Sequence, residues 1–231
     1  VEEEHRPLAQ DIGLGDRLEC PLVVGLDAEI ADFFLNHGHG YDPPLKTNEI
    51  MKLAKANFYK KDFDWTLQQV KNLKQSSSLL IANDAVELFL LIQDNSVEDS
   101  LRVALQAYAK ADLQLYQKKN EEALQSFLSI LQKHKGESIE DETLLKIAKI
   151  YEQKKEYNTA LSYYQNILEN HKEGIYIDEA LFFSAEIYRK YLLDNEKAKP
   201  LYEKMVLEHA DSLYYTESRK QYRALRGDAT I

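Results

Sequence analysis

The residues most able to do chemistry lie close together near the N-terminus. His37 and His39 are separated by a single glycine, and Asp42 follows shortly after them. Two imidazoles and a carboxylate are ligands that Zn²⁺ and other transition metals accept. Two histidines one residue apart rarely close a coordination sphere alone, and the sequence places no further ligand beside them. We therefore interpret them as solvated histidines in a polar loop and expect no metal site.

The single cysteine, Cys20, is a candidate nucleophile. A reactive thiolate needs a neighbouring base and an activating environment. Cys20 instead precedes Pro21 and a short apolar run, which is typical of a small buried hydrophobe. The sequence also lacks a glycine-rich phosphate loop and a G-x-S-x-G nucleophile turn. We therefore expect a protein that is not an enzyme and that uses no cofactor.

Three further histidines, His134, His171 and His209, recur along the chain, each at the end of a stretch with helical periodicity. A regular series of histidines could form a ladder of ligands. A histidine near a helix C-terminus, however, also interacts favourably with the negative end of the helix dipole. Because each histidine belongs to a different repeated unit, we interpret all three as structural.

The charge of the chain limits its classes of partner. The 231 residues include 29 Lys or Arg and 39 Asp or Glu, for a formal net charge of −10. Nucleic-acid binding requires a basic stripe, and no such cluster occurs. No run of apolar residues is long enough to span a membrane. We therefore expect a protein or peptide partner, whereas the oligomeric state does not follow from these features.

The composition changes at about residue 45. Most of the 8 glycines and 5 prolines lie before this point, so we predict an irregular or extended segment over residues 1–45. Residues 46–231 are almost free of helix breakers, and their apolar residues recur at three- and four-residue spacing. Only short polar breaks interrupt this pattern, so neighbouring helices must run antiparallel. We predict an all-α domain over residues 46–231.

A repeat runs through the second half of this domain. Residues 108–134, 144–171 and 181–209 share small residues in a first and a second helix, then an aromatic and an aliphatic residue. The first small residues recur every 37 positions. In the order of the three copies, these positions are Ala111, Ala148 and Ala185; Ala123, Ala160 and Ala198; Phe127, Tyr164 and Tyr202; and Ile130, Ile167 and Met205.

This pattern resembles the tetratricopeptide repeat, a helix–turn–helix of about 34 residues with small residues where its two helices cross. The resemblance covers residues 104–209 well. A weaker copy lies over residues 53–73, with Ala54, Thr66, Val70 and Leu73 in the corresponding places. Its distance from the next copy predicts an extra helix over residues 79–94. The proline that usually closes the repeat is replaced by charged or polar residues.

The C-terminal residues 211–228 are predicted to form a capping helix. Leu213, Tyr214, Tyr222 and Leu225 would make its apolar face. Ser212 is the expected N-cap, and the glycine at position 227 is the expected stop. The predicted architecture is therefore a TPR-like α-solenoid of antiparallel helix pairs with a C-terminal cap.

The resemblance implies a non-catalytic scaffold that binds a peptide or protein. In such arrays the first helix of each pair lines the concave face, and a tyrosine-rich groove of mixed charge suits an extended or helical peptide. By the register of the repeat, the partner-binding residues are expected to be Tyr108, Asp112, Leu115, Glu142, Lys149, Glu152, Glu186 and Arg189.

Two alternatives remain open at this point. The ending EHADSLYYTESRKQYRALRGD is similar to that of TPR-like lipoproteins and periplasmic coordinators of the bacterial envelope. That similarity implies an envelope assembly or coordination factor and favours the periplasm or cell envelope over the cytoplasm. The other alternative is an enzyme or metal-binding module in residues 1–45, with the array as its docking arm.

Overall fold

The computed structural model describes residues 47–76, 78–97, 101–171 and 174–228. These residues belong to one compact unit, Leu45–Ile231. The candidate metal ligands His37, His39 and Asp42, the candidate nucleophile Cys20 and the predicted irregular segment 1–45 lie outside the described residues.

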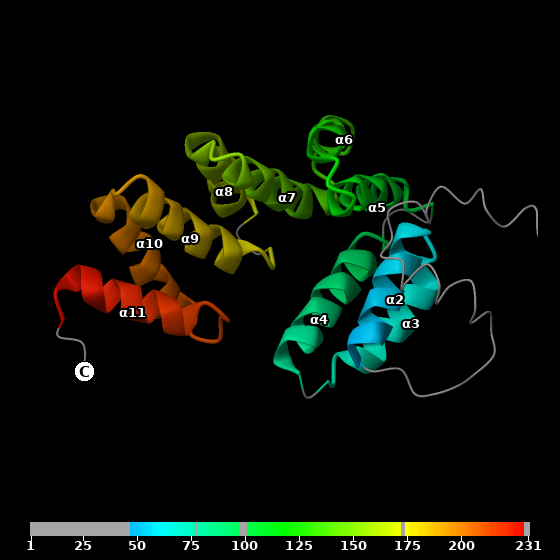
Figure 1. Cartoon of the computed structure of the whole chain (residues 1–231), viewed down its shortest axis with the longest axis horizontal. Coiled ribbons are helices and arrows are strands. Elements are labelled where there is room, and N and C mark those ends of the chain that lie inside the picture. The colour runs from blue at the N-terminus through cyan, green and yellow to red at the C-terminus, as the bar shows by residue number, and fades with distance from the viewer. Residues whose placement is uncertain (1–46, 77, 98–100, 172–173, 229–231) are drawn as a thin grey trace, which may run out of the picture. The chain divides into compact units, whose positions relative to one another are not determined.

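The described residues form helices and contain no strand, which confirms the all-α prediction. Figure 1 shows the helices, and most consecutive ones pack against each other. In chain order they are α2 (Thr47–Tyr59), α3 (Phe63–Leu73), α4 (Leu79–Asp94), α5 (Val103–Tyr116), α6 (Asn120–Lys133), α7 (Ile139–Gln153), α8 (Tyr157–Asn170), α9 (Ile177–Glu186), the π-helical turn η2 (Ile187–Tyr191), α10 (Asn195–Glu208) and α11 (Tyr215–Arg226).

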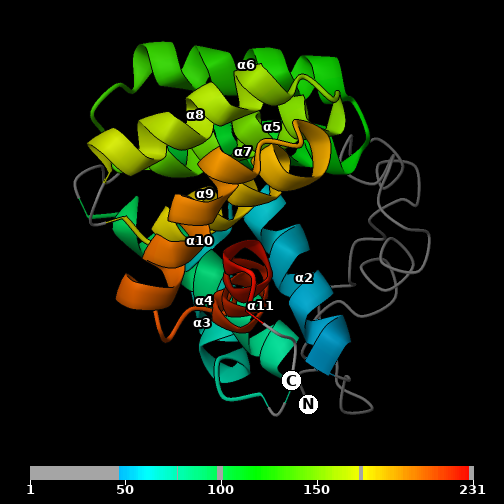
Figure 2. The ribbon, with the colours of Figure 1, turned by 90° about the vertical axis from the view of Figure 1, so that its left-hand side faces the viewer.

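Four helix pairs share the same turn between first and second helix. One residue in each turn has a left-handed backbone, and these residues are Lys61, Lys118, Lys155 and Leu193. The next residue donates its N–H back into the first helix, as Glu156 does to the carbonyl of Tyr151 at 2.9 Å. This arrangement satisfies carbonyls at the helix end. The shared turn defines four helix pairs, which are α2–α3, α5–α6, α7–α8 and α9–α10. Figure 2 shows the second helices α6, α8 and α10 following one another.

The small residues lie where the two helices of each pair cross. Ala111, Ala123, Ala148 and Ala160 have no exposed surface. Without larger side chains at these points the two helix axes can approach closely. The aromatic residues four positions after the second alanines, Phe127, Tyr164 and Tyr202, are also fully buried. These positions agree with the predicted register of the repeat.

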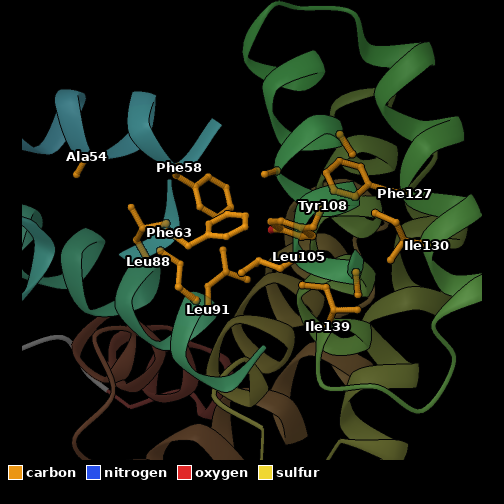
Figure 3. Packing of buried hydrophobic residues seen from close by; sticks show 14 of the residues in the cluster. Ala54, Phe58, Phe63, Leu88, Leu91, Leu105, Tyr108, Phe127, Ile130 and Ile139 are labelled. Carbon is orange, nitrogen blue, oxygen red and sulfur yellow. The ribbon is translucent and has the colours of Figure 1, made fainter. Parts of the chain in front are cut away.

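The weaker copy, α2–α3, keeps the same crossing with a different residue. Thr66 occupies the place of the second alanine and is fully buried. Its hydroxyl donates to the carbonyl of Asp62 at 2.8 Å, so burial leaves no unpaired donor. In Figure 3, Phe58 and Phe63 fill the core beside this crossing, with ring centroids 5.5 Å apart.

The fourth pair contains one more residue than the others. Its two alanines, Ala185 and Ala198, are separated by 13 positions, whereas the three other pairs have a separation of 12. The turn η2 accommodates the additional residue, and the N–H of Leu192 donates to the carbonyl of Ile187 five residues earlier, at 3.1 Å. Single π-helical turns of this kind insert one residue without ending the helix.

Both predicted extra helices are present. The helix α4 covers the predicted residues 79–94, and α11 packs against α10 as the C-terminal cap. Gly227 ends α11 with a left-handed backbone, as predicted. Two details of the cap prediction are wrong. Leu213 is 68% exposed, and Ser212 is not the N-cap, because Tyr214 holds that position and donates its N–H to the Ser212 hydroxyl at 3.2 Å.

Candidate functional site

One carboxylate links the first helices of three pairs. Asp112 on α5 accepts from the hydroxyl of Tyr59 on α2, at 2.9 Å. Its other oxygen lies 3.2 Å from Nζ of Lys146 on α7. Burial, together with the nearby Asp112 charge, raises the pKa of Tyr59 far above its usual range, so this hydroxyl stays a donor. The first helices therefore carry a continuous polar row, and we call the surface that they share the first-helix face.

Lys149 extends this row by one turn of α7. Its Nζ lies 5.3 Å from the ring centroid of Phe183 on α9, within the range of a cation–π contact. Burial and the neighbouring charge of Lys146 lower the pKa of Lys149. Among the described residues no carboxylate lies within 4.0 Å of its ammonium group. Lys149 is therefore a half-buried cation held against an aromatic ring.

In two consecutive pairs, a tyrosine of the second helix donates to a glutamate of the first. Tyr164 donates to Glu152 at 3.1 Å, and Tyr202 donates to Glu186. Burial raises the pKa of Glu152. At Glu186 burial acts in the same direction, but hydrogen bonds from Lys190, Tyr202 and Arg189 outweigh it and lower the pKa. Glu186 is therefore a buried, ionised carboxylate with its charge compensated locally.

These two glutamates line a cavity of about 260 Å³. The cavity lies where α7, α9, η2 and α11 meet. Its walls combine aromatic rings with carboxylates and a lysine, and the lining residues are Glu152, Phe182, Phe183, Glu186, Lys190, Tyr191 and Glu217. The ring of Phe182 is fixed by stacking on Tyr214, with centroids 4.6 Å apart. The lining residues include no serine, threonine, cysteine or histidine.

The structure distributes the predicted partner-binding residues between the surface and the core. Asp112, Leu115, Lys149, Glu152 and Arg189 are partly exposed. Glu152 lies beside Glu186 at the cavity, and Arg189 is 3.0 Å from Glu186. Leu115 packs against the core.

The other three predicted residues are buried. Tyr108 is 2% exposed, and its ring packs edge-on against Phe127 at 5.4 Å, as Figure 3 shows. Glu142 is 3% exposed and accepts from Asn95 at 3.2 Å. Burial, followed by the neighbouring Asp141, raises its pKa well above the usual range. Glu186 is 6% exposed, and it forms part of the wall of the cavity.

Sequence reasoning missed several residues of the first-helix face and of the cavity. Tyr59, Lys146, Phe183 and Glu217 were not predicted, although each takes part in a contact or a wall described above. The repeat period would have identified one of them, Phe183. Phe183 lies 37 residues after Lys146, so it occupies the same register position on the next first helix. Glu217 could not be found in this way, since it comes from the cap.

The three recurring histidines each follow the last residue of a second helix. The N–H of His134 donates to Ile130, that of His171 to Ile167 and that of His209 to Met205. His209 also lies 2.7 Å from Asp178. No cluster of three or more potential metal ligands occurs in the part of the chain that the structure describes. Each of the three histidines therefore occupies the C-cap position of its second helix.

Comparison with protein families matches residues 142–173 to the tetratricopeptide repeat. This range covers most of α7 and all of α8. The chain carries a tetratricopeptide repeat. The pairs that share its turn and its buried small residues give the domain the architecture of a TPR-like helical solenoid. No curated protein matched the chain.

The TPR architecture points to protein partners and to a scaffold for protein–protein interaction. Among the described helices, none combines the length and the apolar character that a bilayer-spanning helix requires.

Proposed function

We propose that the chain is a non-catalytic scaffold and that it binds a partner peptide along the first-helix face. The observation that carries this proposal is the continuous row from Tyr59 through Asp112 to Lys146. Three different first helices contribute to it. A partner lying across this face would therefore touch several repeats at once.

The chemistry of the row supports a peptide as its partner. Half-buried charges, such as Lys149, lie beside aromatic rings, such as that of Phe183. Such surfaces supply both the directed hydrogen bonds and the apolar contacts that peptide recognition uses. Asp112 and Lys146 form an ion pair within the chain, so their side chains are already held in place before a partner binds. Less side-chain conformational entropy is therefore lost on binding.

Site-specific photo-crosslinking tests this proposal. A photoreactive amino acid replaces Lys149 on the first-helix face, or Lys133 as a control. Lys133 is exposed on the second helix α6. Each protein is irradiated in lysate of the source organism, and the crosslinked products are identified by mass spectrometry. We expect a defined protein to be crosslinked from position 149 and not from position 133.

A partner that crosslinks equally from both positions, or from position 133 alone, would contradict binding by the first-helix face. Crosslinks from both positions to many unrelated proteins would also contradict the proposal that the chain is a scaffold.

A further inference from the structure

The fourth helix pair departs from the others at its turn. Three pairs place a lysine at the left-handed position, namely Lys61, Lys118 and Lys155, whereas the fourth places Leu193, with φ 54°. A left-handed backbone disfavours a branched apolar residue. Leu193 is also 79% exposed, so packing does not compensate for this cost. An exposed leucine at a strained position suggests a role outside the fold.

The exposed apolar surface continues into the neighbouring residues. Tyr191 is 49% exposed, and Leu192 is 36% exposed. The ring of Tyr191 is held in place by stacking on Tyr157, with centroids 4.3 Å apart. We call Tyr191, Leu192 and Leu193 the apolar edge. It begins at the last residue of η2, so the inserted residue and the apolar edge occur at the same place in the array.

The cavity described above adjoins this edge, because Tyr191 belongs to both. Three carboxylates and a single lysine line it. At about 260 Å³ it is smaller than the roughly 300–1,000 Å³ typical of small-molecule sites. Its size and its aromatic walls therefore suit one side chain better than a cofactor. Aromatic faces beside carboxylates attract the cationic groups of arginine and lysine.

Two of the carboxylates are open to such a cation. The Oε2 atom of Glu152 accepts the hydrogen bond from Tyr164. Its Oε1 atom accepts no hydrogen bond within the described residues. Glu217 accepts a hydrogen bond from Gln221 at 2.5 Å and forms a long ion pair with Lys220 at 3.7 Å. Both contacts are exposed, so they contribute little free energy and an incoming cation can replace them. Glu186 is bound by Arg189 and Lys190. Lys190 is half-exposed, and exposed ion pairs contribute little free energy, so an incoming cation can displace it.

We propose that the fourth helix pair binds a partner segment in which a basic residue lies next to an apolar one. The basic side chain enters the cavity between Glu152 and Glu217, and the apolar side chain lies on Leu192 and Leu193. This inference rests on the proposed scaffold function and names the chemistry of the partner.

Selection from an unbiased displayed library of random peptides tests the inference on the full chain. We expect the enriched peptides to carry Arg or Lys next to a large apolar residue. In binding assays with these peptides, Glu217→Gln and Leu193→Lys should each weaken the affinity about tenfold or more. Leu193→Lys introduces the residue that the other three turns carry, so the variant is expected to fold.

Matched controls come from the second helix α10. Glu208→Gln repeats the change of charge at an exposed position, and Leu207→Lys repeats the loss of an exposed leucine, which is 73% exposed. Both should bind like the parent chain. Equal losses in the variants and their controls would overturn the inference.

The test separates this inference from the scaffold proposal. Enriched peptides that lack basic residues, and whose binding depends on Lys149 rather than on Glu217 and Leu193, would overturn the inference and leave the scaffold standing. A library that yields no binding peptide would overturn the inference, and the crosslinking experiment would then decide the scaffold separately.

Discussion

Tyr164 on α8 donates its hydroxyl to Glu152 on α7, with 3.1 Å between Oη and Oε2. This bond joins the two helices of one pair beside the candidate cavity. The preceding pair has a phenylalanine, Phe127, at the same register position, so the ring fits the packing without the hydroxyl. Core packing therefore requires only the ring of Tyr164, and the role of its hydroxyl is the hydrogen bond to Glu152.

We expect Tyr164→Phe to lower the free energy of unfolding by about 1–2 kcal/mol, because a half-buried carboxylate loses a hydrogen-bond donor. Urea denaturation followed by circular dichroism measures this change. Tyr157→Phe is the control, since the Tyr157 hydroxyl donates no hydrogen bond within the described residues. An unchanged midpoint for Tyr164→Phe would show that the bond contributes nothing to stability.

The buried Glu142 predicts a dependence of stability on pH. Burial raises its pKa in the folded chain above its value in the unfolded chain, so the folded state binds the proton more tightly. Stability from this group is present in acid and is lost as the pH rises from the unfolded pKa towards the folded one. Glu142→Gln keeps an acceptor for Asn95 and removes the titration.

Denaturation of both proteins between about pH 4 and pH 8 tests this expectation, since the unfolded pKa of a glutamate is about 4.3. The variant should gain stability relative to the parent as the pH rises. A difference that stays constant over this range would contradict a raised pKa at Glu142.

Ala160 tests the register of the repeat. It has no exposed surface at the crossing of α7 and α8. We expect Ala160→Trp to overpack the crossing and to cost about 1–3 kcal/mol or more. Ala224→Trp, at an exposed position of α11, should leave the melting temperature near that of the parent. Equal melting temperatures for the two variants would refute the register.

Leu193 should be replaceable by glycine with a gain in stability. Glycine adopts a left-handed backbone without the steric cost that leucine has, so Leu193→Gly should stabilise the fold by roughly 0.5–1 kcal/mol. Leu207→Gly, within the helix α10, should destabilise it by about 1 kcal/mol. Differential scanning calorimetry compares the two, and a destabilised Leu193→Gly would show that the leucine contributes to the fold.

Most of the fold could be predicted because its signals are local. The spacing of Ala111, Ala148 and Ala185 sets the repeat, and all three are buried at crossings. The additional helix α4 followed from the long step between Ala54 and Ala111. The turn η2 was not predicted, although the separation of 13 positions between Ala185 and Ala198 indicated an inserted residue.

The site could be predicted only in part, because it depends on contacts between distant segments. The register placed Glu152 on the first-helix face, but it could not separate exposed positions from buried ones, and Tyr108 turned out to be core. Leu213 has the periodicity of an apolar face, yet it precedes the first residue of α11 and is exposed. The similarity to bacterial envelope proteins stays a prediction.

The most direct test of the account is the affinity of the crosslinked partner for two single variants, measured by calorimetry. Lys149→Gln removes a cation from the first-helix face, and Lys133→Gln makes the same change on α6. We predict a loss of about tenfold or more for Lys149→Gln and none for Lys133→Gln. Equal affinities for the two variants would contradict binding by the first-helix face.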